Sequence, residues 1–249
     1  MSFLSDAYTI WAREMIRFWR QRARVISSLA MPFFWLVFIG YGFGGSLKLP
    51  GMDYTKFLAP GVVGMSILFT GLFTGLSVIW ERQFGFLKEM MVAPVSRTSI
   101  MLGKTLGGAT IAVLNGLVMY IIASAMGMID FTIALGVPLV FMALTALCFV
   151  SIGLMMASRM RNFEAFQALM TFLIVPTMFL SGSLFPLAST PGWMQAVSYA
   201  DPLTYGVDGL RGALLGASYH SLWVDFWLLS AFAVFFLLLG AHYFRKSAN

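Results

Sequence analysis

Long apolar runs separated by short polar segments dominate the chain. Six runs are long enough to cross roughly 30 Å of hydrocarbon at about 1.5 Å per residue. Their apolar residues are continuous, without the alternation that is typical of β-barrel strands, and a helix satisfies its own backbone in lipid. The pattern predicts one all-α membrane domain over residues 1–249 with six transmembrane helices, at 25–45, 57–80, 105–126, 131–157, 165–187 and 222–244.

Composition supports the same class. Hydrophobic residues make up 59% of the chain and charged residues 10%, against about 25% charged in soluble domains, and the mean hydropathy is +0.85. A soluble fold cannot bury this much apolar surface. The single cysteine, Cys148, lies within an apolar run, so no intrachain disulfide is expected.

The distribution of basic residues orients the spans. Six crossings place both termini on one side of the membrane, and of the 16 lysines and arginines only Lys48, Lys56 and Arg211 fall on the other side. Cytoplasmic loops carry this excess of positive charge. We expect a multi-pass protein of the cell (inner) membrane with both termini cytoplasmic. The basic pI of about 9.7 reflects this orientation and indicates no nucleic-acid partner.

Residues 1–24 form a predicted amphipathic helix. Apolar residues recur every three or four positions along it, and arginines occupy the other face. Such a helix lies along the cytoplasmic interface with its arginines toward lipid phosphates, or serves only as a topogenic anchor. The candidate interface residues are Trp11, Arg13, Arg17 and Arg20.

Catalytic and metal-binding patterns are weak. The two histidines, His220 and His242, lie near the ends of the last span and suggest no metal or catalytic cluster. The middles of the spans lack ionisable residues, which disfavours proton-coupled transport; the amides of Asn115 and Gln167 are typical of interhelical hydrogen bonds. We therefore expect no metal and no enzyme.

A partial phosphate-binding motif is also present. Gly103, Lys104 and Thr105 match the end of GxxxxGK[ST], but Thr98 stands where the first glycine is needed and no strand precedes it. Lys104 is read instead as a marker of the cytoplasmic boundary. We expect no ATPase site in this chain.

The cytoplasmic segment 81–104 is amphipathic. Phe84, Leu87 and Met91 share one face of a short helix, interrupted by Gly85 and Pro94. This pattern suits docking into a groove of a soluble partner, although an interfacial helix without a partner fits too. Pairs of small residues, Gly71 with Gly75 and Gly103 with Gly107, predict close helix packing, within the bundle or at a dimer interface.

The outer segment 188–221 is too polar to cross alone. Asp201 before Pro202 predicts a helix that begins there. On that helix Asp208 and Arg211 are three residues apart and close enough to pair. The segment predicts short extracellular re-entrant helices before the last span; an exposed hairpin is the alternative.

Two stretches resemble the permease subunits of type-2 ABC exporters, the family of the daunorubicin-resistance and lipo-oligosaccharide export permeases. The first is Glu81-Arg82-Gln83-Phe84-Gly85-Phe86-Leu87-Lys88, followed by Pro94-Val95-Ser96-Arg97 and Leu102-Gly103-Lys104. The second is Ser181-Gly182-Ser183-Leu184-Phe185-Pro186-Leu187, then Pro191 and Trp193, then Asp201-Pro202-Leu203-Thr204-Tyr205 and Asp208. Gln83 and Lys88 depart from the acidic residues usual in the family.

The resemblance implies a dimer of two such chains, with a homodimer favoured, working with two copies of a separate ABC ATPase subunit. That subunit would bind the ATP and Mg, so this chain needs no cofactor of its own. The implied ATPase-coupling residues are Glu81, Arg82, Phe84, Gly85, Leu87, Lys88, Glu89 and Pro94, and the implied re-entrant residues are Asp201, Pro202, Tyr205, Asp208 and Arg211.

The leading hypothesis is the membrane subunit of an ATP-driven exporter that moves an amphipathic substrate, such as a drug, a lipid or a lipid-linked saccharide. The alternative is an ATP-independent secondary transporter or channel, and a third is a membrane scaffold. A co-purifying ATPase distinguishes the first hypothesis from the other two.

Overall fold

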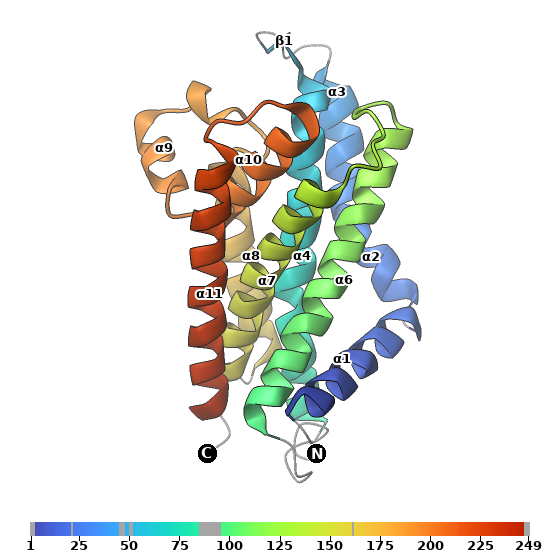
Figure 1. Cartoon of the computed structure of the whole chain (residues 1–249), viewed down its shortest axis with the longest axis vertical. Helices are drawn as coiled ribbons and strands as arrows, with labels where there is room; N and C mark the ends of the chain where they lie inside the picture. The colour runs from blue at the N-terminus through green and yellow to red at the C-terminus, as the bar shows by residue number, and fades with distance from the viewer. Residues whose placement is uncertain are drawn as a thin grey trace.

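The computed structural model describes residues 3–20, 22–44, 48–49, 52–84, 96–160 and 162–246, and nearly all of them are helical (Figure 1). The elements in chain order are α1 (Phe3–Arg20), α2 (Arg22–Phe34), the π-helix η1 (Trp35–Ile39), α3 (Gly40–Gly44), β1 (Lys48–Leu49), β2 (Met52–Asp53), α4 (Tyr54–Gln83), α6 (Arg97–Ala125), α7 (Gly136–Arg159), α8 (Phe163–Leu180), the 3₁₀ helix η2 (Leu187–Ser189), α9 (Gly192–Ser198), α10 (Pro202–Leu215) and α11 (Leu222–Lys246).

Among the described residues, five helices are long and apolar enough to cross a membrane: Tyr54–Gln83, Thr98–Ala125, Gly136–Arg159, Phe163–Leu180 and Leu222–Tyr243. The first predicted span corresponds to α2, η1 and α3, which follow one another without a gap but include an apolar helix of only Ser28–Gly42. Pro32 lies within α2, shortly before the π-helical turns. A proline and a π-bulge both interrupt the regular hydrogen-bond ladder of a helix.

The helical class is confirmed, with one small addition. β1 and β2 form an antiparallel pair in which Lys48 lies opposite Asp53 and Leu49 opposite Met52. Two residues per strand are too few to give a detectable alternation of apolar and polar positions. The pattern of apolar and polar positions therefore does not predict this hairpin.

α4 is the centre of the bundle, and small residues bring α7 against it. A Cβ atom on Gly75 would overlap the carbonyl oxygen of Gly153, and one on Gly71 would lie 3.0 Å from the Cβ of Phe149. In lipid no hydrophobic force drives helices together, so their association depends on the van der Waals contact that small residues permit. The Gly71/Gly75 pair therefore packs within the chain.

Three helix ends lie five or more residues from the predicted span ends. α6 begins at Arg97 rather than at Thr105, because the side chain of Ser96 caps it by accepting from Ser99 N–H. α8 ends at Leu180, before the predicted Leu187, because Gly182 takes a positive φ of 73° that stops the helix. α7 begins at Gly136 rather than near Phe131, since the hydroxyl of Tyr120 holds the backbone of Thr132 at 2.8 and 3.1 Å in a non-helical segment.

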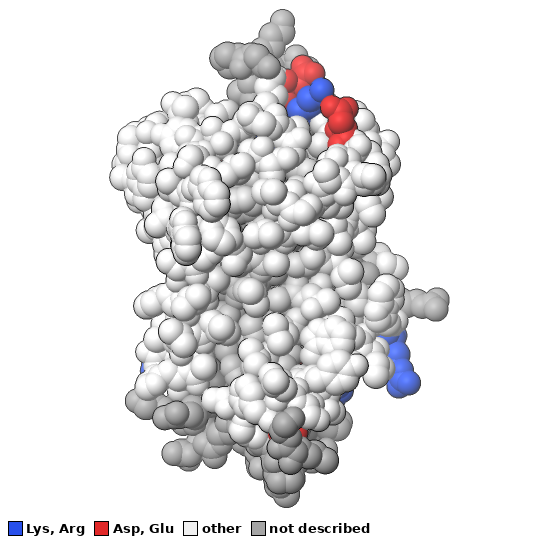
Figure 2. Space-filling model, in the orientation of Figure 1, with Lys and Arg blue, Asp and Glu red and all other residues white. Residues whose placement is uncertain are grey.

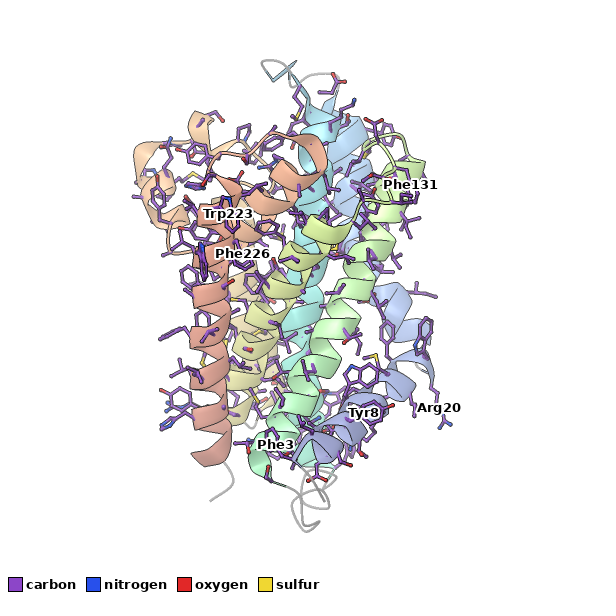
Figure 3. The ribbon with its side chains drawn as sticks, in the orientation of Figure 1. Phe3, Tyr8, Arg20, Phe131, Trp223 and Phe226 are labelled. Atoms are coloured by element: carbon purple, nitrogen blue, oxygen red, sulfur yellow. The ribbon has the colours of Figure 1, made fainter. Side chains whose placement is uncertain are left out.

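Both ends of the chain lie at one end of the bundle, and α9, α10 and the hairpin lie at the other (Figure 1). On the face shown in Figure 2, charged side chains gather at the two ends and the middle is uncharged. Exposed aromatic residues flank this middle: Phe131 and Trp223 toward the outer end, and Phe3 and Tyr8 toward the end with the termini (Figure 3). This distribution suits a membrane-spanning bundle with aromatic belts.

Candidate functional site

The N-terminal helix α1 docks on α6 through a face that combines two acids with two small or apolar residues. Asp6, Ala7, Ile10 and Glu14 are buried, whereas Leu4 is 72% exposed and Tyr8 66% exposed, and Tyr8 can be seen on the outside of α1 in Figure 3. The small residues of α6 permit the contact, because a Cβ on Gly103 would lie 2.7 Å from the Ala7 carbonyl oxygen. The large apolar side chains Leu4 and Tyr8 are thus left for lipid, and the acids of α1 face the protein.

One of these acids, Glu14, belongs to an ion network, defined here as Arg13, Glu14, Arg17, Glu81 and Lys104. Oε1 of Glu81 accepts hydrogen bonds from Arg13 at 2.6 Å and from Arg17 at 2.9 Å. Its Oε2 lies 2.6 Å from the ammonium of Lys104, which donates to Glu14 at 3.1 Å. The network therefore joins α1, the end of α4 and the start of α6.

The acids and the lysine of the ion network are buried, and Glu81 is 3% and Lys104 1% exposed. The side chains of Arg13 and Arg17 remain 40% and 28% exposed. Burial raises the pKa of Glu14, but the positive charges of Lys104, Arg13 and Arg17 outweigh it and hold that pKa below its ordinary value. Each carboxylate is therefore paired with at least one cation on another element.

Arg13 and Arg17, expected to face lipid phosphates, form ion pairs with the buried Glu81. Lys104, read from the sequence as a marker of the cytoplasmic boundary, is buried between two glutamates. Arg20 is exposed and projects from the end of α1 (Figure 3), and Trp11 donates to Thr110 Oγ1 at 3.1 Å.

Three of the predicted coupling residues, Glu81, Arg82 and Phe84, are among the described residues. Glu81 is inside the ion network, whereas Phe84 is 71% exposed. Arg82 donates to the carbonyl oxygens of Met160 and Ser158 at the end of α7. Ser96 caps α6 by accepting from Ser99 N–H. The remaining predicted coupling residues, Gly85, Leu87, Lys88, Glu89 and Pro94, lie outside the described residues.

A cavity of about 1120 Å³ lies beside the ion network, between α1, α2, α4 and α6. Glu14, Arg17 and Arg20 line one part of it, and apolar and hydroxyl side chains line the rest. Asn115 also lines it and donates to Thr70 at 2.9 Å and Ser28 at 3.1 Å, the interhelical bonding expected of it. Gln167, the other amide, is exposed on α8.

At the outer end, α10 is buried along most of its length. Asp201 caps it by accepting from Leu203 N–H at 2.9 Å, and Pro202 occupies the first turn, which confirms the predicted helix start. Burial raises the pKa of Asp201 to about 8, although the Leu203 hydrogen bond opposes the shift. Tyr205 donates its hydroxyl proton to the Tyr199 carbonyl oxygen.

Asp208 and Arg211 do not pair, contrary to their spacing. Asp208 accepts from the backbone N–H groups of Tyr219 and His220, each at 2.7 Å. Arg211 donates to the Gly182 carbonyl oxygen at 3.1 Å, and its guanidinium lies 3.8 Å from the Phe57 ring centroid. Burial lowers the pKa of Arg211 to about 10. Partners on other segments therefore replace the local pair.

Sequence reasoning missed a second cluster, which contains Asp208, His220 and Asp225. Nδ1 of His220 lies 3.4 Å from Oδ2 of Asp208 and 3.6 Å from Oδ1 of Asp225. The signal in the sequence was Asp225 itself, an acid in the first turn of the predicted last span. Ionisable groups in spans mark functional positions.

Comparison with known proteins agrees with both motifs. The family model for "ABC-2 type transporter" matches residues 6–215. Nodulation protein J of Rhizobium leguminosarum bv. viciae is 26% identical over 242 residues, 95% of this chain and 93% of that protein. Inner membrane transport permease YadH of Escherichia coli (strain K12) is 28% identical over 240 residues, covering 93% and 91%.

A third relative is similar over a shorter stretch. Putative transport permease ycf38 of Porphyra purpurea is 27% identical over 208 residues, 80% of this chain and 70% of that protein. The matched region contains the ion network, the coupling segment and α10. This chain belongs to the ABC-2 type transporter family.

Proposed function

We propose that this chain is the membrane subunit of an ATP-driven exporter in the inner membrane. Two copies of a separate ABC ATPase subunit bind ATP and Mg and drive it, and the chain itself carries no ATPase site. Family membership supports this proposal, as do relatives named transport permeases.

The proposal includes six crossings with both termini cytoplasmic. Beside the five long apolar helices, α2, η1 and α3 run from the level of α1 to the outer end (Figure 1) and supply the sixth. The segment between α8 and α11 starts and ends at the outer end (Figure 1). It therefore returns without crossing, which supports re-entrant helices α9 and α10.

One observation carries the coupling mechanism: the ion network and the cavity share Glu14 and Arg17. Glu81 of the same network is the first residue of the coupling segment, a few residues before the exposed Phe84. A displacement of the inner end of α4 therefore pulls on Arg13 and Arg17, and so moves α1, the cytoplasmic wall of the cavity.

In this mechanism the exposed Phe84 and the residues after it dock on the ATPase. Glu81 does not touch the ATPase; it transmits the movement to α1 and α6. The tie between Arg82 and the end of α7 carries part of the movement to a second span. ATP binding and hydrolysis would thus change the cavity without a nucleotide entering the bundle.

The cavity suits an amphipathic substrate. Apolar side chains such as Phe69 and Phe73 line its depth, while Arg17 and Arg20 lie at its cytoplasmic part. An acyl or aromatic portion would occupy the apolar part, and an anionic group would lie near the arginines.

A second copy of the chain would complete the pathway. In the most apolar stretches of α8 and α11, only 22% and 17% of the residues are buried inside the chain. Most of the surface of both helices is therefore available to lipid or to a second permease chain. We propose a homodimer.

The first experiment is affinity purification of the tagged chain from native membranes. The exporter proposal requires an ABC ATPase to co-purify, and its absence would contradict the proposal in favour of an ATP-independent transporter. In the reconstituted complex, Glu81→Gln is then expected to reduce substrate-stimulated ATP hydrolysis at least about tenfold while the ATPase remains bound.

Glu164→Gln is the matched control. Glu164 is an exposed glutamate in the first turn of α8, at the same end of the bundle, and it takes part in no ion pair that the structure describes. Stimulation should be unchanged in this variant. Equal stimulation in the Glu81 and Glu164 variants would show that the ion network does not transmit the movement.

A further inference from the structure

The outer cluster, defined as Asp208, His220 and Asp225, joins two helices at the extracellular end. Asp208 is on α10, Asp225 is in the first turn of α11, and His220 lies in the connection between them. All three offer a donor atom within 4.8 Å of the others. α10 and the start of α11 lie at the outer end of the bundle, opposite the end of α4 that leads into the predicted coupling residues (Figure 1), so the cluster lies outside the proposed ATPase contact.

The spacing of the donor atoms fits one small ion. Ligand atoms about 2.1 Å from a tetrahedral zinc are about 3.4 Å apart from one another. His220 Nδ1 is 3.4 Å from the Asp208 oxygen and 3.6 Å from the Asp225 oxygen. These separations are long for hydrogen bonds but match the edges of a metal coordination shell.

An independent observation points to a ligand. Asp225 is fully buried, at 0% exposure, and in the described part of the chain no N–H group donates to either of its carboxylate oxygens, which face the acid Asp208 instead. Neither ring nitrogen of His220 has a hydrogen-bond partner among these residues. Buried polar groups are nearly always satisfied by a partner, and a bound ion is one such partner.

No lysine or arginine of the described residues forms an ion pair with either aspartate. The rings of Tyr199, Tyr205 and Tyr219 pack against the imidazole, at centroid distances between 4.8 and 5.9 Å. Arg211 is near enough for its charge to interact with Asp208, but it donates to Gly182 and lies over the Phe57 ring. Two buried acids beside an imidazole therefore favour a doubly charged cation.

We propose that the outer cluster is a binding site for a divalent transition-metal ion, zinc foremost, with Asp208, Asp225 and Nδ1 of His220 as ligands. An imidazole ligand favours zinc over magnesium or calcium, which take oxygen ligands. Three protein ligands leave a fourth position for water or another ligand. The bound ion would fasten α10 to the outer end of α11.

The test uses the purified full chain in detergent. The chain is stripped with EDTA, exchanged into metal-free buffer and titrated with ZnCl₂ in the presence of excess MgCl₂, and bound zinc is measured by mass spectrometry. One zinc per chain is expected. Cobalt(II) loaded in its place should show the intense visible absorption of a tetrahedral site, which reports on ligand geometry without any transport measurement.

The ligand variants are His220→Ala and Asp225→Asn, each expected to weaken zinc binding more than about 100-fold, beyond the loss typical of a second-shell change. The matched controls are His242→Ala, the exposed histidine at the other end of α11, and Asp130→Asn, an exposed aspartate at the outer end. Both controls should bind zinc as the unaltered chain does.

Absence of zinc binding in the unaltered chain would overturn the proposal whatever the variants do. Binding that survives in His220→Ala and Asp225→Asn would overturn it as well, by placing the ion elsewhere. Because zinc is measured on the chain alone, the result is independent of whether an ATPase co-purifies.

Discussion

The ion network at the inner end and the outer cluster are both buried and both join helices, but they differ in charge balance. The inner one has Arg13, Arg17 and Lys104 for two glutamates, and each carboxylate has a cation within 3.2 Å. The outer one has two aspartates and one histidine. The acids of the inner network are paired with cations of the chain itself, whereas those of the outer cluster have no ion-paired lysine or arginine among the described residues and suit a bound cation.

This difference indicates two kinds of function. A self-neutralised network of ion pairs holds its helices in one arrangement and can pass a displacement from one to the next. A cluster with unpaired buried carboxylates can be stable only when something else neutralises it. The inner end therefore suits mechanical coupling, and the outer end suits ligand binding.

The largest expected effect comes from removing the shared acceptor of the ion network. Glu81→Ala leaves Lys104 with Glu14 alone and leaves Arg13 and Arg17 without their common partner, so it should lower the free energy of unfolding by about 3–5 kcal/mol. Denaturation of the purified chain in detergent micelles measures the loss.

A double-mutant cycle sharpens this prediction. Glu81→Ala leaves the buried ammonium of Lys104 with one of its two carboxylate partners. Adding Lys104→Met removes that ammonium and should recover part of the loss, since apolar replacement of a buried ion pair is often neutral. Additive losses in the cycle would mean that Glu81 and Lys104 do not act as a unit. The exposed Glu164→Ala should cost less than about 0.5 kcal/mol.

The second effect tests the outer cluster. Zinc at 100 times its dissociation constant should stabilise the chain by about 2.7 kcal/mol, measured as a rise in melting temperature over the EDTA-treated chain. Asp225→Asn should abolish the rise, whereas Glu81→Ala should retain it. Loss of the rise in both variants would contradict the independence of the two ends.

The third effect concerns how α1 is seated beside the ion network. A methyl group on Gly103 would lie 2.7 Å from both the Ala7 carbonyl oxygen and the Ile10 Cβ, so Gly103→Ala should push α1 away and cost about 1–3 kcal/mol. Gly42→Ala, with nothing within 4 Å of its added Cβ, should be neutral or slightly stabilising. Equal stability of the two variants would show that α1 is not held at Gly103.

Much of the bundle followed from sequence because long apolar runs need a helix in lipid. The start of α10 also followed from it, since Asp201 and Pro202 act within their own first turn. The orientation of α1 did not. Amphipathic spacing shows that Leu4 and Tyr8 share a face, but whether protein or lipid covers that face depends on Gly103 and on Glu81, which are far along the chain.

The outer cluster was out of reach for a similar reason. Asp208, His220 and Asp225 come together only because Gly216 takes a left-handed conformation, with φ of 67°, that ends α10 and turns the chain back. Side-chain spacing within one helix cannot anticipate such a turn. The same limit explains Asp208 and Arg211, whose partners lie on other segments.

The smallest expected effect is a pH dependence of the stability that arises from Asp201 and not from the outer cluster. Because burial raises its pKa from 3.8 to about 8, the folded chain holds a proton that the unfolded chain releases. The stabilisation is therefore complete below pH 4 and is lost as the pH rises toward 8. Between pH 7 and pH 8 the loss should be about 1 kcal/mol.

Asp201→Asn keeps a side-chain oxygen for Leu203 N–H and cannot ionise, so its stability should stay flat over the pH interval where that of the unaltered chain declines. Melting temperatures in EDTA at pH 6, 7 and 8 measure the difference without interference from zinc. The exposed Asp130→Asn should follow the unaltered chain. A parallel decline in Asp201→Asn would assign the pH dependence to another group. The first candidate would then be the outer cluster, which holds two further buried carboxyl groups, Asp208 and Asp225, at the same end of the bundle.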